Sequence, residues 1–125
     1  MNSILIDLTE KLIEEERSNY FLYSEDTWEM DLDSKNFTVG DALHEILHNE
    51  IKTLGDWIDI IHPNYVDDFK DNLESFLKGL SPHFYCSYLI ETKEGWKMIE
   101  DWGKISSYSR EQSPSKLIGI KTIAA

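Results

Sequence analysis

Residues 57–80, WIDIIHPNYVDDFKDNLESFLKGL, contain the clearest helix of the sequence and decide its fold. Pro63 disfavours helical backbone at His62, so the chain should break there, before a helix that Asn64 can cap. Gly79 stands where such a helix would stop. Apolar residues recur at helical spacing on one face of the segment: Val66, Phe69, Leu73, Phe76, Leu77 and Leu80. The pattern predicts a helix with one buried face, entered through a sharp change of direction.

Three segments with strand character follow this helix and are separated by turns. They are residues 84–92, 96–108 and 116–124. In the first segment, alternate positions form a set that can face inward: Phe84, Cys86, Tyr88 and Ile90. Three strands with short connections predict an antiparallel meander.

Two further strands and a short helix precede the long helix. Residues 27–39 change direction at the turn 33–36 and predict two short strands. Residues 41–49 predict a short helix capped by Asp41. The complete order predicts an α+β domain, with a five-stranded antiparallel sheet that carries short helices and one longer helix on one face.

An additional helix is predicted near the N-terminus. It divides the chain into a connecting helix, residues 1–22, and a domain, residues 23–125. Its narrow apolar stripe has acidic neighbours, which is typical of a seam between two helices. The stripe consists of Leu5, Leu8 and Leu12. We therefore expect a homodimer whose interface includes this helix.

Composition excludes several classes of partner. The chain of 125 residues has a net charge of −12, and such a surface repels nucleic acid and anionic membranes. Cys86 is the single cysteine, so neither an internal disulfide nor a cysteine-based zinc site can form. The apolar start lacks a basic lead, and no apolar run reaches the roughly 20 residues of a membrane span. We expect a cytoplasmic protein.

Residues 44–48, HEILH, match the H-E-x-x-H pattern of zinc metalloproteases, in which two histidines on one helical face bind zinc. Glu45 would then act as general base. Five-residue patterns recur by chance, and a zinc hydrolase also needs a third ligand and a substrate cleft. We therefore expect His44, Glu45 and His48 to point mostly outward, and a zinc-dependent hydrolase is the alternative. The core positions of this helix would be Leu43, Ile46 and Leu47.

Five local patterns resemble those of the PAS, or sensory box, family of bacterial signalling proteins. They are WEMDLDSKNFTV at residues 28–39, ALHEILHN at 42–49, WIDIIHP at 57–63, EGWKMI at 94–99 and KLIGIKTI at 116–123. WIDIIHP, for example, is similar to the family's W-x-x-x-I-H-P, which precedes a long helix. Five such patterns in the correct order, with the expected elements between them, are hard to produce by chance.

The resemblance implies a regulatory sensor or interaction module of a larger signal-transduction protein, such as a histidine kinase or a diguanylate cyclase. The module itself would not be an enzyme. Its output domain would lie in the same chain, and we expect the sequence that ends at Ala125 to be a fragment. A small ligand or a partner would shift the long helix against the sheet. The residues expected to line a ligand cavity are Trp57, Phe69, Leu73, Phe76, Tyr88 and Met98.

The resemblance also bears on cofactors, and we expect none. Flavin-binding light sensors of this family carry a reactive cysteine in an N-C-R-F-L-Q-like segment on a short helix, whereas Cys86 lies in a predicted strand. Haem-binding members commonly use a histidine on the long helix, and residues 65–79 contain none. Cys86 would therefore be a small buried residue, and His62 a structural histidine at the entry to the long helix.

Overall fold

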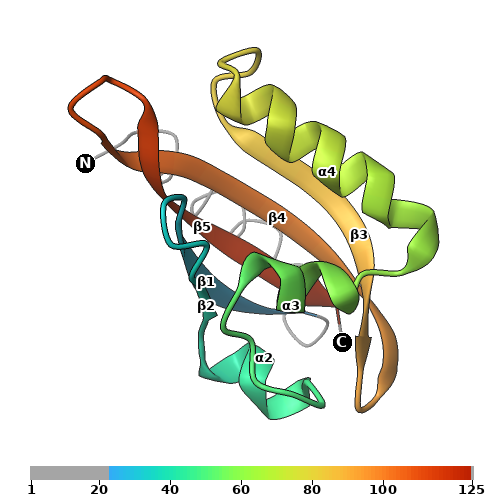
Figure 1. Ribbon diagram of the computed structural model, residues 1–125. Coiled ribbons are helices and arrows are strands. Elements are labelled where there is room, and N and C mark those ends of the chain that lie inside the picture. Colours follow the sequence, from blue (N-terminus) through green and yellow to red (C-terminus); the bar gives the residue numbers. More distant parts are fainter. Residues whose placement is uncertain (1–22, 125) are drawn as a thin grey trace.

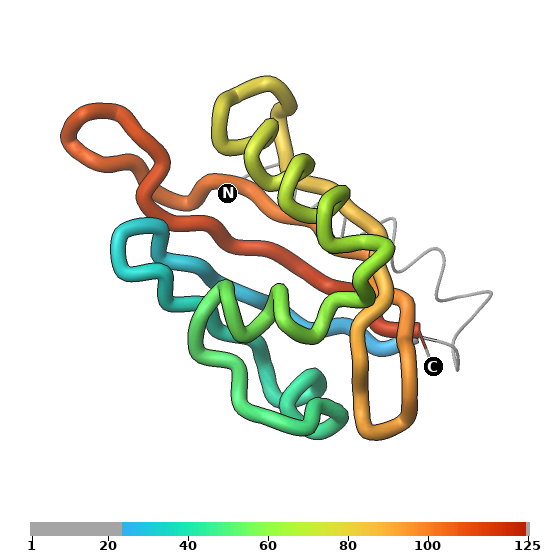
Figure 2. The backbone as a smooth tube through the Cα atoms, turned by 45° about the vertical axis from the view of Figure 1, so that its right-hand side comes forward, coloured from blue at the N-terminus to red at the C-terminus, as the bar shows by residue number. Residues whose placement is uncertain are grey.

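The computed structural model describes residues 23–124, which form a sheet with helices on one face (Figures 1 and 2). The strands are β1 (Tyr23–Asp31), β2 (Phe37–Val39), β3 (Phe84–Thr92), β4 (Gly95–Tyr108) and β5 (Pro114–Ala124). The helices are α2 (Asp41–Ile46), α3 (Leu54–Asp59) and α4 (Pro63–Leu77). The predicted N-terminal helix, with Leu5, Leu8 and Leu12, lies outside the described residues.

The sheet has the strand order β2-β1-β5-β4-β3, and every neighbouring pair is antiparallel. The prediction of a five-stranded antiparallel sheet is therefore confirmed. Strands β3, β4 and β5 form the expected meander. Strand β5, the last in the chain, lies in the middle of the sheet and pairs with β1 on one side and β4 on the other.

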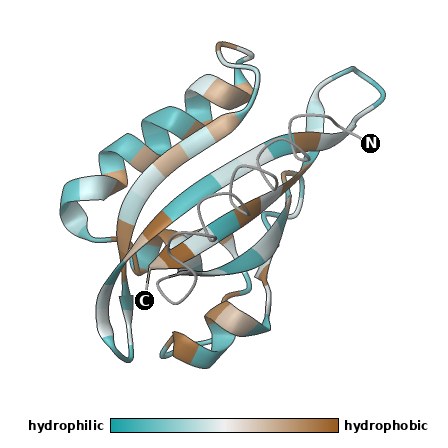
Figure 3. Cartoon of the chain, turned by 180° about the vertical axis from the view of Figure 1, so that it is seen from behind, coloured by the Kyte–Doolittle hydropathy of each residue, from teal (hydrophilic) through white to brown (hydrophobic). Residues whose placement is uncertain are grey.

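Strand β1 alternates between buried residues on the helix side and exposed residues on the other side, whereas residues 119–123 of β5 are all buried. Figure 3 shows the same sheet from behind, coloured by hydropathy. On the helix side, Trp28 of β1 crosses β5 and β4 above two glycines that face each other, Gly103 and Gly119. A Cβ atom at either glycine would collide with the indole ring. The absence of side chains at these positions therefore lets a large ring lie flat against the middle of the sheet.

Helix α2 is shorter than predicted and is capped differently. It ends at Ile46 rather than at residue 49, and its N-cap residue is Gly40, which makes no side-chain capping bond. The predicted cap, Asp41, is instead the first helical residue. The Leu43 amide donates to Asp26 Oδ2 of β1 at 2.9 Å. The N-terminus of α2 is thus satisfied by a carboxylate that is distant in sequence.

Helix α4 begins at the predicted break, but with a different cap. His62 has extended backbone, and its Nδ1 accepts a hydrogen bond from the Asn64 amide at 3.1 Å. His62 is therefore the structural histidine that was expected, and Asn64 is not the cap. The helix ends at Leu77, and the Gly79 and Leu80 amides bond back to Phe76 and Ser75 in the pattern of a Schellman motif. Gly79 has a φ of 79° and stops the helix as predicted.

The buried face of α4 is narrower than the sequence predicted. Phe69, Leu73 and Phe76 are buried, and Val66 and Leu77 are partly buried against the same core. Leu80 was assigned to this face, but it lies beyond the helix end and is 75% exposed. The Schellman turn ends the helical period before Leu80 can reach the sheet.

Replacing Phe76 by Ala should lower the free energy of unfolding by about 3–5 kcal/mol, because the change leaves a cavity between α4 and β3. Phe76 is 2% exposed and its ring lies 6.3 Å from that of Phe84. Leu80→Ala is the matched control and should change stability by no more than about 0.5 kcal/mol. Urea denaturation of both variants measures the difference, and equal effects would contradict the assigned packing.

Candidate functional site

A buried ion pair lies at the centre of the sheet, on the face covered by the helices. Asp101 of β4 and Lys121 of β5 are direct cross-strand partners. Lys121 Nζ lies 2.5 Å from Asp101 Oδ2, and each side chain is only 1% exposed. Lys and Asp are almost never fully buried unless they are paired. The pair is therefore the feature of this core that most needs explanation.

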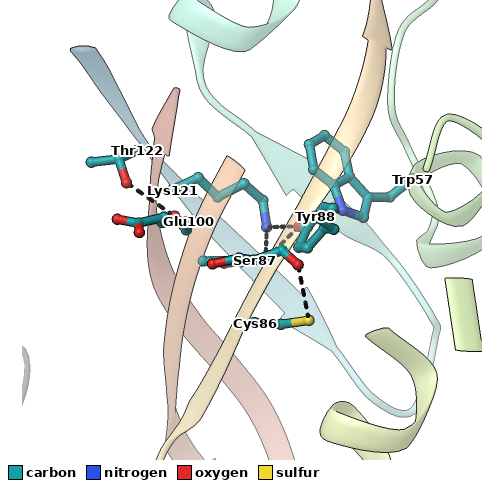
Figure 4. A network of polar contacts seen from close by, with 8 residues as sticks. Trp57, Cys86, Ser87, Tyr88, Glu100, Lys121 and Thr122 are labelled. Carbon is teal, nitrogen blue, oxygen red and sulfur yellow. Dashed lines mark hydrogen bonds and ion pairs between the residues drawn. The ribbon is translucent and has the colours of Figure 1, made fainter. Parts of the chain in front are cut away.

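A chain of hydrogen bonds extends from the ion pair to helix α3 (Figure 4). The Tyr88 hydroxyl of β3 donates to Asp101 Oδ2 at 2.6 Å, and Trp57 Nε1 of α3 donates to the Tyr88 oxygen at 2.9 Å. Lys121 Nζ also reaches that oxygen, at 3.4 Å. A displacement of α3 would therefore strain bonds that end on the middle strand, β5, and on its neighbour β4.

Three aromatic rings surround the Lys121 ammonium group. Its Nζ lies 4.6 Å from the ring centroid of Trp28, 4.6 Å from that of Trp57 and 5.3 Å from that of Phe37. A cation within about 6 Å of an aromatic face is attracted by the negative face of the ring, more strongly where water is excluded. We call Trp28, Phe37, Trp57, Tyr88 and Asp101 the Lys121 cage.

Burial and pairing oppose each other in the protonation of this cluster. Burial raises the pKa of Asp101 and lowers the pKa of Lys121, while the attraction between the two groups acts against both changes. Burial, followed by the nearby Asp101 carboxylate, raises the pKa of Tyr88 well above its ordinary value. The tyrosine therefore keeps its proton and acts as a hydrogen-bond donor to Asp101.

The structure brings together five of the six residues that were expected to line a cavity. Trp57, Phe69, Leu73, Phe76 and Tyr88 all belong to one buried cluster beneath α3 and α4. The Phe69 ring lies 5.1 Å from the Tyr88 ring, and the Trp57 ring lies 6.3 Å from it. This cluster is continuous with the cage through Trp57 and Tyr88.

Met98 is the residue that the structure separates from the others. It precedes the buried Ile99 in β4 and pairs with Leu89 of β3. Since successive side chains of a strand point to opposite faces, Met98 lies on the face away from the helices. It therefore does not lie with the other five, because the alternation along β4 turns it to the opposite face.

Asp101 and Lys121, the ion pair at the centre of the cluster, were not among the residues that the sequence predicted. A usable signal existed in β5, where Leu117, Gly119, Lys121 and Ile123 share one face by alternation. A lysine among apolar neighbours on an inward face requires a buried anion. Only the register between β4 and β5 identifies Asp101 as that anion.

The HEILH segment does not have the geometry of a zinc-binding helix. Helix α2 ends at Ile46, and Leu47 has extended backbone, with φ −90° and ψ 149°. The two histidines are therefore not one helical turn apart on one face. His44 Nε2 instead lies 3.4 Å from the Ile51 amide, from which it accepts a hydrogen bond, and His48 is exposed. Within residues 23–124, no group of three or more His, Cys, Asp or Glu side chains could hold a metal ion.

Comparison with known proteins identifies the fold. No family model and no curated protein matches the sequence. Among solved structures, the N-terminal domain of a Marinobacter aquaeolei diguanylate cyclase with PAS/PAC sensor matches with a TM-score of 0.67 at 16% identity, over 78% of this chain and 93% of that one. The sensory box histidine kinase/response regulator of Burkholderia thailandensis matches with a TM-score of 0.63 at 14% identity, over 78% and 74%.

A third match is the PAS domain of the Cronobacter turicensis RpfR quorum-sensing receptor in complex with BDSF, with a TM-score of 0.57 at 12% identity, over 78% of this chain and 90% of that one. The chain has the fold of a PAS domain. In this PAS fold, the Lys121 cage lies between the sheet and α3. No helix within residues 23–124 is long and apolar enough to cross a membrane.

Replacing Lys121 by Met should lower the free energy of unfolding by about 3–5 kcal/mol, because the Asp101 carboxylate would stay buried without its partner. The double variant Lys121→Met, Asp101→Asn should be more stable than Lys121→Met alone, since it removes the unpaired charge. A double-mutant cycle by denaturant unfolding measures this coupling. Additive effects of the two changes would contradict a direct ion pair.

Cys86 should be almost inert towards thiol reagents while the domain is folded. Its side chain is buried, and burial raises the pKa of the thiol to about 11. At pH 8 only about one thiol in a thousand would then be the reactive thiolate. Labelling with a disulfide reagent should therefore follow the fraction of unfolded protein across a urea titration. Rapid labelling in native buffer would contradict this environment.

Proposed function

We propose that this chain is a regulatory sensor or interaction module of a larger cytoplasmic signal-transduction protein, of the histidine kinase or diguanylate cyclase type. The observation that carries the proposal is the PAS fold, complete over residues 23–124. Two of the most similar solved structures are sensor-containing parts of a diguanylate cyclase and a histidine kinase. In this proposal the module regulates and does not itself catalyse.

The hydrogen-bonded core supports a role in transmitting a change of helix position. A continuous chain of buried hydrogen bonds connects α3 with β3, β4 and β5. Its members are Trp57, Tyr88, Asp101 and Lys121. Buried hydrogen bonds are costly to break without replacement, so a displacement of α3 acts on the sheet through the bond between Trp57 and Tyr88. A ligand or a partner that displaces α3 or α4 would therefore alter the central strands as well.

The face of the sheet away from the helices supports an interaction role. By the strand alternation, several apolar residues point to this face: Tyr85, Met98, Trp102, Ile118 and Ile120. Tyr85 is exposed, whereas Trp102 and Ile120 are buried and the other two are half-buried. The rings of Tyr85 and Trp102, which are cross-strand partners, lie 5.4 Å apart. An apolar sheet face suits packing against a helix or a second subunit. We propose that the active form is a homodimer whose interface includes the N-terminal stripe.

The homodimer should be visible by sedimentation of the chain at micromolar concentration. Changing Leu8 and Leu12 to Ser should weaken it, because both changes remove apolar area from the proposed helical seam. Leu80→Ser is the matched control, since Leu80 is 75% exposed on the domain surface and should not affect association.

Native mass spectrometry of the same preparations tests the sensor role. If the domain binds a small ligand, a bound molecule should remain after purification. A chain that is monomeric throughout the micromolar range and carries no bound molecule would contradict the proposed sensor and interaction roles together.

A further inference from the structure

The Lys121 cage contains the groups by which proteins recognise alkylammonium ligands. A carboxylate lies 2.5 Å from the nitrogen, and a tyrosine oxygen lies 3.4 Å from it. Three rings from β1, β2 and α3 place their centroids within 5.3 Å of the same atom. Aromatic rings arranged around a cation are the common solution for binding amines and quaternary ammonium ions.

We propose that this cage is a primary alkylammonium-binding site whose resident ligand is the protein's own Lys121 side chain. The inference rests on the geometry of the cage and is independent of the signalling role proposed above. Lys121 reaches the cage from β5 as a tethered amine, with its carbon stem buried along the sheet. An amine from solution would have to replace it.

The cage offers more polar contacts than the ion pair alone uses. Asp101 Oδ1 and Trp28 Nε1 are both buried, and neither has a hydrogen-bond partner within residues 23–124. Buried polar groups are normally satisfied. Asp101 Oδ1 is an acceptor with spare capacity beside the ammonium group, which favours a recognition site over a minimal ion pair.

The walls of the cage are held independently of Lys121. Trp28 lies against the backbone of Gly103 and Gly119, and Trp57 donates its hydrogen bond to Tyr88. Truncating Lys121 should therefore leave a space that does not collapse completely. In Lys121→Ala this space would have the length of propylammonium, with the Asp101 carboxylate at its far end.

The route of entry passes through α3, which covers the cage. This helix spans only Leu54–Asp59 and is held at its start by a capping box between Thr53 and Asp56. Short helices open locally at lower cost than the sheet. A small amine can therefore exchange with the cage by displacement of α3 and does not require global unfolding.

The test measures the melting temperature of the 125-residue chain with propylammonium and with 1-propanol, a neutral molecule of similar size. For Lys121→Ala we expect a rise of about 3–8 °C with propylammonium, because the ligand binds only the folded state. Wild type should not respond, since Lys121 occupies the cage. Lys116→Ala, which truncates an exposed lysine of the same strand, is the matched control and should also not respond.

Two further variants keep the test decisive. Lys121→Ala with Asp101→Asn removes the carboxylate and should lose most of the response to propylammonium. Lys121→Met with Asp101→Asn fills the cage with a neutral side chain and should fold without responding. If Lys121→Ala is unfolded in buffer alone, propylammonium should restore its near-ultraviolet circular dichroism.

The proposal would be overturned by either of two results. One is that propylammonium neither stabilises nor refolds Lys121→Ala. The other is that wild type or the variant without the carboxylate responds equally. Neither result depends on signalling or dimerisation, so the outcome is distinguishable from failure of the proposed function.

Discussion

The ion pair between Asp101 and Lys121 is the constraint on which the rest of this core depends. Removing a carboxylate and an ammonium group from water costs several kcal/mol for each ion, and only close pairing with further polar contacts offsets that cost. The two residues face each other across β4 and β5, so a shift of register by one residue would separate them. The pair thus specifies the register of the middle of the sheet.

The other members of the cage follow from that constraint. Tyr88 supplies the hydrogen bond that the carboxylate needs, and Trp57 in turn satisfies the tyrosine oxygen. Trp28 and Phe37 bring the rings of the remaining two strands to the ammonium group. Every strand and α3 therefore contribute a side chain to one cluster. Its arrangement makes the position of α3 dependent on the sheet.

The chain junction between α3 and α4 holds the helices in place over this cluster. The His62 amide donates to the Leu89 carbonyl, and the Glu91 amide donates to the Ile60 carbonyl, both at 2.8 Å. Ile61 thereby forms an isolated bridge with Ile90 of the edge strand β3. These backbone hydrogen bonds hold this segment of the chain to β3 only a few residues after Trp57, which contributes its ring to the cage. The same segment covers an exposed strand edge, which would otherwise be open to association.

The sequence by itself determined the elements and most of their buried faces, because those depend on contacts within one turn or one strand. Pro63 and Gly79 predicted the two ends of α4 through backbone geometry, and alternation predicted the inward face of β3. Five of the six expected cavity residues were likewise found in one cluster, since helical and strand periods identify buried positions without knowledge of their neighbours.

Tertiary structure alone decided how these faces meet. The pairing of β5 with β1 joins residues from opposite ends of the domain, and no local pattern encodes that register. The same limitation applies to three further features. Asp26 accepts the hydrogen bond from the Leu43 amide at the start of α2, and that helix ends before His48. Lys121 pairs with Asp101. Each of these outcomes depends on which distant group is close enough to satisfy a buried charge or an unpaired amide. That distance exists only once the sheet has formed.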